Sequence, residues 1–305
     1  MFKKFLSKFL CKPEKNKSRE HLSALTIILL IVLILYAVSL FVPLGWALIT
    51  AFKNQSDFRI NIIGFPKQWV WNFSYVLQKF TVTVQTAEGE KLVGMGMMYL
   101  NSLLYSVGCA FFGTLVPCIT AYMCARFNYK FSKVIYITVI VVMIVPVVGS
   151  LPAEIRMAQA LHLYDHIWGL WLMKANFLGM YFLVFHGIFK SLPMAYFEAA
   201  KIDGAGNFRI LFQIALPLVR SLFFTVMLIN FITFWNDYQT PLIFMPSHPT
   251  VALGMFHMAT TAENTLATIP MRMAGAMLLL IPILIVFLFT HKRLMGNLTV
   301  GGIKG

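Results

Sequence analysis

Charged residues are scarce in this chain. Asp, Glu, Lys and Arg make up 12% of its 305 residues, against roughly 25% in soluble globular domains. Acids are the scarcer sign, with 11 Asp and Glu against 25 Lys and Arg, while 59% of the residues are hydrophobic. This balance excludes an ordinary soluble domain and predicts a polytopic membrane protein. The cations are scattered between apolar runs rather than gathered on one soluble face, which argues against nucleic acid as a partner.

Cysteine and nucleotide-binding motifs are equally sparse. Cys11, Cys109, Cys118 and Cys124 form no CxxC pair, and the last three fall within one apolar segment, too far apart along it to bridge one another. The sequence contains no GxxxxGK[ST] phosphate loop, so the chain is not itself an ATPase. No nucleophile and base form a recognisable set. We therefore predict no disulfide framework, no catalytic residues and no cofactor held by this chain.

One pair of histidines has metal-ligand spacing. His162 and His166 stand at i and i+4, which would place both on one face of a helix. No third ligand is apparent. The favoured interpretation is a wet interfacial helix, with no metal site.

Long apolar runs dominate the rest of the sequence. They predict an all-α fold with six transmembrane helices, near residues 24–50, 98–125, 134–151, 168–189, 218–244 and 273–290. The first run is much longer than a signal-peptide core, so we expect it to remain as an anchor. Residues 1–23 form a basic tail, either disordered or a short amphipathic helix on the membrane. The predicted transmembrane domain covers residues 24–292 and a C-terminal tail residues 293–305.

The distribution of Lys and Arg predicts the orientation. If the N-terminus is cytoplasmic, the cytoplasmic segments hold 17 of the 25 Lys and Arg residues. Positive residues favour the cytoplasmic side of a membrane. Both termini and the loop at residues 190–217 are therefore expected in the cytoplasm.

That loop contains the most specific pattern in the chain, Glu198–Pro217. Helix formers at 198–201 are followed by Asp203-Gly204, where Gly can adopt the left-handed conformation of a helix C-cap. Asn207 is a plausible N-cap for a second short helix, which Pro217 is expected to stop. Such a helix–turn–helix at a membrane surface is suited to docking into another protein.

This pattern resembles the EAA loop of permease subunits of bacterial ABC importers. In that family the first helix of the loop sits in a cleft of the ATPase subunit and transmits ATP-driven closure to the transmembrane helices. The resemblance assigns an ATPase-coupling interface to nine residues: Glu198, Ala199, Ala200, Asp203, Gly204, Ala205, Ile214, Leu216 and Pro217. A cytoplasmic helix hairpin without this role is the simpler alternative.

The resemblance extends to the smaller permease of maltose-type carbohydrate importers, a binding-protein-dependent transport inner-membrane component. It rests on Tyr181–Pro193, on Trp235-Asn236-Asp237 with Pro241-Leu242, and on the closing Gly301–Gly305. It implies a second, larger permease, two ATPases that bind ATP and Mg²⁺, an extracellular solute-binding protein, and a location in the bacterial cytoplasmic membrane. It also implies that the tail Gly301, Gly302, Ile303, Lys304 and Gly305 contacts the ATPases, unless this terminus is simply frayed.

A polar cluster follows the predicted fifth span. Trp235, Asn236, Asp237 and Tyr238 have the chemistry to bind a sugar, with an aromatic face and hydroxyl-binding groups. Asp237 is expected near the outer edge of the membrane core, where an acid is tolerated and could instead cap a helix or hold a loop. Lining of the transport pathway is thus one of two interpretations. Four other polar residues within spans are expected to form helix–helix hydrogen bonds: Asn101, Asn176, His186 and Asn230.

Other classes of membrane protein fit less well. A secondary transporter usually has buried acids near the midplane, and here acids are absent from the centres of the predicted spans. A permease for a non-sugar solute would share the EAA-like loop but should differ around residues 235–242. A structural scaffold would have no ATPase partner.

Overall fold

The computed structural model describes residues 24–86, 89–127, 129–145, 148–260 and 268–298. The chain divides into two units, Met1–Ala47 and Leu48–Gly305. The first consists, where it is described, of most of helix α2 (Ala24–Ala51), an uninterrupted helix with Pro43 inside it. It coincides with the predicted first span.

The second unit begins with a segment that the sequence predicted only as an extramembrane loop. It contains α3 (Gln55–Ile60), α4 (Asn72–Lys79) and an antiparallel hairpin of β1 (Thr81–Thr86) and β2 (Gly89–Gly94). The hairpin corrects the all-α prediction. Strand β1 alternates, with Val82 and Val84 buried between exposed neighbours, and this period-two pattern is typical of a half-buried strand.

Two buried polar side chains stabilise this segment. Asn72 Nδ2 donates to the carbonyl oxygen of Ala51, the last residue of α2 (2.9 Å), and to that of Lys53, just beyond the helix (2.7 Å). Lys53 is fully buried, and its Nζ donates to Asn61 O at 2.6 Å. The start of the loop is thereby tied to the end of the helix.

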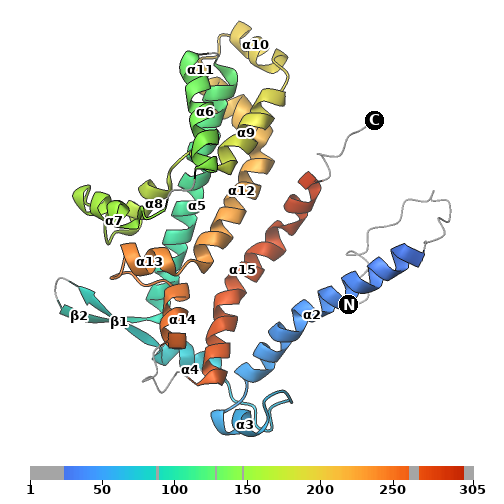
Figure 1. The fold of residues 1–305 in the computed structure, drawn as a ribbon, viewed down its shortest axis with the longest axis vertical. Coiled ribbons are helices and arrows are strands. Elements are labelled where there is room, and N and C mark those ends of the chain that lie inside the picture. Colours follow the sequence, from blue (N-terminus) through green and yellow to red (C-terminus); the bar gives the residue numbers. More distant parts are fainter. Residues whose placement is uncertain (1–23, 87–88, 128, 146–147, 261–267, 299–305) are drawn as a thin grey trace. The chain divides into compact units, whose positions relative to one another are not determined.

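Helix α5 (Met95–Arg126) is the central element of the second unit. It packs against α12 (Leu216–Asn236), α9 (Met180–Ser191) and α8 (Ile167–Lys174), and Figure 1 shows it alongside α9 and α12. The remaining helices of the described chain are α6 (Lys130–Ile144), α7 (Leu151–Ala160), α10 (Ala195–Ile202), α11 (Asn207–Ile210), α13 (Gln239–Phe244), α14 (Val251–Thr260) and α15 (Ile269–Leu298).

Polar residues join these helices, as expected for some positions and not for others. Asn230 Nδ2 donates to Thr114 Oγ1 at 3.0 Å, which confirms a hydrogen bond between α12 and α5. Asn101 donates instead to Pro249 O, in the loop before α14. Asn176 lies outside any helix, between α8 and α9, and the ring of His186 lies 4.8 Å from that of Tyr136.

Among the described residues, four helices are long and apolar enough to cross a membrane: Thr26–Ala51, Met95–Arg126, Asn207–Asn236 and Ile269–Thr290. The predicted third span is shorter than expected, because α6 has 15 residues and ends at Ile144. The predicted fourth span is not one helix, since residues 175–179 separate α8 from α9. Glycine at position 179, with extended backbone, stands where α9 begins.

Candidate functional site

Helix α10 carries the first part of the predicted coupling interface. Phe197 and Ala200 are buried, whereas Glu198 and Ala199 are exposed. Residues three apart share a helix face, so Phe197 and Ala200 attach α10 to the rest of the unit while the other face points outward. Of the three residues of the Glu-Ala-Ala pattern, Ala200 therefore packs inside the chain.

The turn after α10 has the geometry that the sequence predicted. Gly204 has φ +79°, and its N–H donates to Lys201 O, while Ala205 N–H donates to Ala200 O at 2.9 Å. These two bonds form a Schellman motif, in which the left-handed residue is usually Gly. Asp203, immediately before, is exposed. The direction in which the chain leaves α10 is thus set by one glycine.

An apolar surface is exposed around this turn. Ile202 is 86% exposed and Phe208 82% exposed, and the side chains of Tyr196 and Phe212 are also exposed. These four residues, which we call the loop face, lie before and after the turn along the chain, among exposed charged residues. Several large apolar side chains exposed on one loop favour an interaction with another protein.

The second half of the loop corrects two predictions. The N-cap of α11 is Gly206 rather than Asn207, and Asn207 is the first helical residue. Pro217 does not stop the helix, because α11 continues through a π-helical turn, Leu211–Ala215, into α12. A proline clashes with the carbonyl four residues before it in a regular helix, and a π turn widens the helix at that place.

This continuity changes how the predicted residues are placed. Ile214 and Leu216 are partly buried in a helix that runs from the loop into the core, and Leu211 and Ala215 beside them are buried. The predicted helix–turn–helix is therefore one short helix followed by the start of a 30-residue helix, Asn207–Asn236.

Arg126, at the end of α5, connects that central helix to α10. Its Nη2 donates to Leu192 O at 2.9 Å, its guanidinium carbon lies 3.9 Å from the centroid of the Phe197 ring, and its Nη1 contacts the sulfur of Met194. A guanidinium stacked on an aromatic face combines a cation–π attraction with hydrogen bonding. Sequence analysis counted Arg126 only as a topology signal.

The polar cluster after α12 is largely engaged in holding the fold. Trp235 is buried and its Nε1 donates to Leu279 O of α15 at 3.0 Å. Asp237 accepts from Tyr105 OH at 2.9 Å and from the backbone N–H of Thr240 at 3.1 Å. The acid thus ties α5 to the start of α13.

The other two members of the cluster, Tyr238 and Asn236, differ in their contacts and exposure. Tyr238 stacks on Phe256, with ring centroids 4.6 Å apart. Asn236 is exposed, and its Nδ2 donates to Ile232 O one turn earlier in α12. Asn236 is therefore the most accessible of the four. The predicted fifth span, drawn to Phe244, ends as a helix at Asn236.

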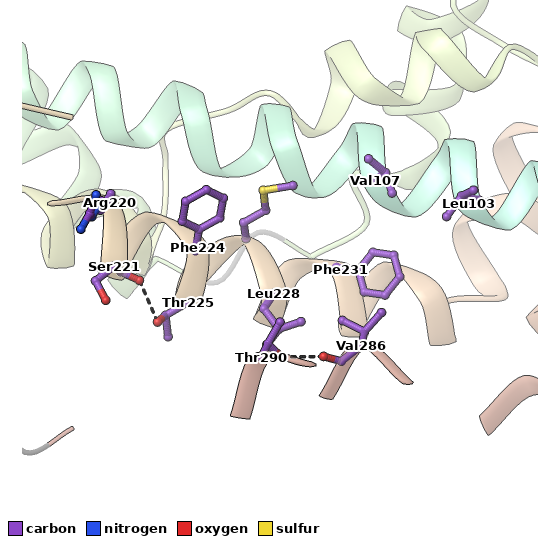
Figure 2. A pocket seen from close by; sticks show the side chains of 11 residues that line it. Leu103, Val107, Arg220, Ser221, Phe224, Thr225, Leu228, Phe231, Val286 and Thr290 are labelled. Carbon is purple, nitrogen blue, oxygen red and sulfur yellow. Dashed lines mark hydrogen bonds between the residues drawn. The ribbon is translucent and has the colours of Figure 1, made fainter. Parts of the chain in front are cut away.

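A cavity of about 650 Å³ lies between α5, α12 and α15 (Figure 2). Its walls are mostly apolar, with Arg220 and Ser221 at one end and Leu103 at the other. The hydroxyls of Thr225 and Thr290 bond to carbonyls one turn earlier in their own helices. Sequence analysis missed these residues as a site, because hydroxyls spaced along apolar helices give no motif.

The histidines with metal-ligand spacing do not lie on one helical face. His162 has φ +55° in the turn after α7, and His166 precedes α8 and stacks on Trp168, so the two histidines do not share a helix. In the described part of the chain, no group of three potential metal ligands is found. The basic tail 1–23 and the predicted ATPase-contacting tail Gly301–Gly305 lie outside the described residues, and α15 extends past the predicted boundary at 292.

The sequence profile of the family described as "Binding-protein-dependent transport system inner membrane component" matches residues 113–297, more than half of the chain. The chain belongs to this family. The matched region of the permease includes α10, the loop face and most of the wall of the 650 Å³ cavity. The chain is therefore a transport component, and its apolar helices indicate a multi-pass membrane protein.

Individual relatives cover almost the whole permease. It is 30% identical to the maltodextrin transport system permease protein MalD of Streptococcus pneumoniae, over 95% of this chain and 98% of that protein. It is 25% identical to the melibiose/raffinose/stachyose import permease protein MelC of Bacillus subtilis, over 87% and 92%. It is 27% identical to the diacetylchitobiose uptake system permease protein NgcG of Streptomyces coelicolor, over 88% and 86%.

A solved structure shares the fold. A chain from the crystal structure of a bacterial ABC transporter that imports the acidic polysaccharide alginate superposes with a TM-score of 0.71, covering 92% of the permease and 99% of that chain, at 19% identity. At this identity the likeness concerns the fold alone.

Proposed function

We propose that this chain is the smaller permease subunit of an ATP-driven importer of a sugar or oligosaccharide. The loop face around Gly204 is the observation that carries the coupling part of the proposal, because four large apolar side chains are exposed there beside a rigid turn. The carbohydrate part is supported by relatives named for maltodextrin, melibiose and diacetylchitobiose. A non-sugar solute is the alternative substrate class.

The proposed assembly has five chains of four kinds. A second, larger permease completes the pathway, two ATPases bind ATP and Mg²⁺ on the cytoplasmic side, and a solute-binding protein delivers the sugar from outside. The large exposed apolar surface of α6, including Ile137 and Val141, is consistent with a chain that is covered by lipid and by other subunits.

The proposed topology has six crossings with both termini in the cytoplasm. Four crossings are the long apolar helices, and the other two are α6 and the α8–α9 pair. A break such as residues 175–179 is tolerated within a membrane where neighbouring helices satisfy the freed backbone groups. The charge distribution supports a cytoplasmic position for α10.

Coupling follows from how α10 is held. Closure of the ATPases would move α10, and two rigid connections would carry that movement into the membrane. One is Arg126, which links α10 to the end of α5, and the other is the continuous helix Asn207–Asn236. Moving these helices together would switch the pathway from inward-facing to outward-facing.

The pathway itself is proposed to run along the cavity between α5, α12 and α15, with Asn236 at its outer end. Trp235, Asp237 and Tyr238 would support that end through their contacts rather than bind sugar. Most sugar contacts would come from the larger permease.

The proposal is tested by purifying the tagged full chain in mild detergent and identifying what accompanies it. We expect a P-loop ATPase, a second permease and a solute-binding protein, and ATP-dependent uptake of a labelled oligosaccharide in proteoliposomes. Recovery of the chain alone or only with copies of itself, after mild crosslinking, would contradict the heteromeric importer. ATP-dependent uptake of an amino acid or metal with no sugar uptake would contradict the substrate class alone, and uptake driven by an ion gradient without ATP would favour a secondary transporter.

A further inference from the structure

A second cavity, of about 680 Å³, lies beside the end of α5, where α6 begins and α9 ends. Four cationic residues line it: Arg126, Lys130, Lys133 and Lys190. We call it the basic cavity. Its lining residues come from two parts of the chain, 124–136 and 183–190, which only the fold brings together. No sequence motif predicts it.

The charges of the basic cavity are not balanced. None of the described residues that line it is Asp or Glu, and the contact of His248 with Asp165 lies elsewhere in the described chain. The first turn of α6 contains no acid, and its N-cap makes no side-chain hydrogen bond. The positive end of the α6 dipole therefore adds to the cations. Such an arrangement favours an anion with several acceptor oxygens.

The basic cavity also has apolar walls. Leu183 and the ring of Tyr136 line it together with the cations. On α6 itself, Val134, Ile137 and Val141 form an exposed apolar stripe that starts at the level of Lys133. A ligand that matches both parts has an anionic head and an apolar tail.

The location of the basic cavity at the end of a membrane-spanning helix suits a ligand with an anionic head and an apolar tail. The cavity lies at the end of the helix Met95–Arg126, which is long and apolar enough to cross a membrane, and so at the depth of lipid headgroups. Basic pockets between transmembrane helices on the cytoplasmic side are suited to anionic lipid headgroups. We propose that the basic cavity binds the phosphate headgroup of an anionic phospholipid, whose acyl chains extend along α6.

This site would act on coupling, a consequence that rests on the proposed function. Arg126 both lines the basic cavity and contacts Leu192, which precedes α10, and Phe197 within α10. A bound phosphate would hold the guanidinium in this position and stiffen the connection between α10 and α5. We therefore expect coupled transport to depend on anionic lipid.

The binding test uses the full chain with the subunits that accompany it, in detergent and without ATP. Binding of dioleoylphosphatidylglycerol is measured by native mass spectrometry against dioleoylphosphatidylcholine. The cavity variant is Lys130→Gln, Lys133→Gln and Lys190→Gln, and it leaves Arg126 unchanged. The control variant, Lys67→Gln, Lys79→Gln and Lys91→Gln, removes the same charge from exposed positions of the 52–94 loop.

We expect affinity for phosphatidylglycerol to fall about tenfold or more in the cavity variant and to stay unchanged in the control, because each lysine near an anionic headgroup contributes appreciably to binding. Equal losses in both variants, or no loss in the cavity variant, would overturn the site. Displacement of the lipid by equimolar inorganic phosphate would also overturn it, in favour of a soluble anion. Since no ATP is used, these outcomes do not depend on whether the chain partners an ATPase.

Discussion

At the scale of single residues, Gly204 is a position in the loop where backbone conformation matters and space does not. Its φ of +79° is costly for other residues, yet no atom lies within 4 Å of the place where a Cβ would be. We expect Gly204→Val to destabilise the turn by about 1–2 kcal/mol, because of backbone strain rather than a steric clash. Transport per ATP hydrolysed should fall severalfold, while membrane insertion is unchanged.

The matched control for this prediction is Gly206→Val. Gly206 lies two residues away with φ −69°, which any residue can adopt, and it also has open space around it. Both variants are compared for sugar uptake and ATPase activity in proteoliposomes. If Gly204→Val kept the same ratio of uptake to ATP hydrolysis as Gly206→Val, the left-handed turn would not be needed to transmit movement.

Arg126 is the second residue whose geometry makes a specific prediction. Because its guanidinium both donates to Leu192 O and stacks on Phe197, Arg126→Lys keeps the charge but loses the planar geometry. We expect uptake per ATP to fall about fivefold or more in Arg126→Gln and to recover only in part in Arg126→Lys, while the complex still assembles.

Arg209→Gln is the control for this charge loss. Arg209 is exposed on α11 and its Nε donates to Gln213 Oε1, so its removal should leave α10 attached to α5. Assembly is followed by size-exclusion chromatography, and coupling by the ratio of uptake to ATP hydrolysis. An Arg126→Gln complex with unchanged coupling would argue against this connection.

At the scale of elements, the packing of α8 on α5 depends on one glycine. A Cβ at Gly108 would lie 2.1 Å from Nε1 of Trp171, whose N–H donates to Leu104 O. The Trp ring is held by that bond and cannot easily move. We expect Gly108→Ala to displace α8 and to cost about 1–3 kcal/mol, the usual range for overpacking.

Gly96→Ala, in the first turn of the same helix, is its control, because nothing lies within 4 Å of the added Cβ there. Thermal denaturation of the complex in detergent, followed by tryptophan fluorescence, measures the difference. A midpoint lowered equally by both substitutions, or by neither, would mean that α8 does not depend on this contact.

The elements also show what sequence reasoning can and cannot reach. The Schellman turn at Gly204 was predictable, because a left-handed residue and helix formers are encoded locally. The prediction that Pro217 ends a helix was wrong. A single proline usually marks a helix end, and the π turn that accommodates this one has no sequence signature. The hairpin at residues 81–94 was missed because its apolar face is short and is completed by distant helices.

The same limit applies to the candidate sites. The apolar cavity and the basic cavity are built from helices distant in sequence, and Arg126 contacts residues 66 and more positions away. Conversely, Trp235 and Asp237 looked suited to sugar by side-chain chemistry, but their hydrogen bonds are used within the fold. Residue type predicts what a side chain can bind, whereas tertiary packing decides what it does bind.

At the scale of the whole molecule, the proposed orientation can be tested by chemical accessibility. Two exposed positions on predicted opposite sides are replaced singly, as Ile202→Cys beside the coupling turn and Thr83→Cys on the hairpin. The native cysteines at 11, 109, 118 and 124 are first replaced by alanine. Intact cells are then treated with a membrane-impermeant maleimide.

Since Lys and Arg favour the cytoplasmic side, we expect Thr83→Cys to react in intact cells and Ile202→Cys to react only after the membrane is opened. The reverse pattern would place α10 outside the cell, where no ATPase could reach it, and would contradict the coupling proposal. Reaction of both positions in intact cells would place them on the same side, with an even number of crossings between them. It would contradict the proposed topology, in which α5, α6 and the α8–α9 pair separate the hairpin from α10. The alanine background must retain uptake, so that the labelled protein is the functional one.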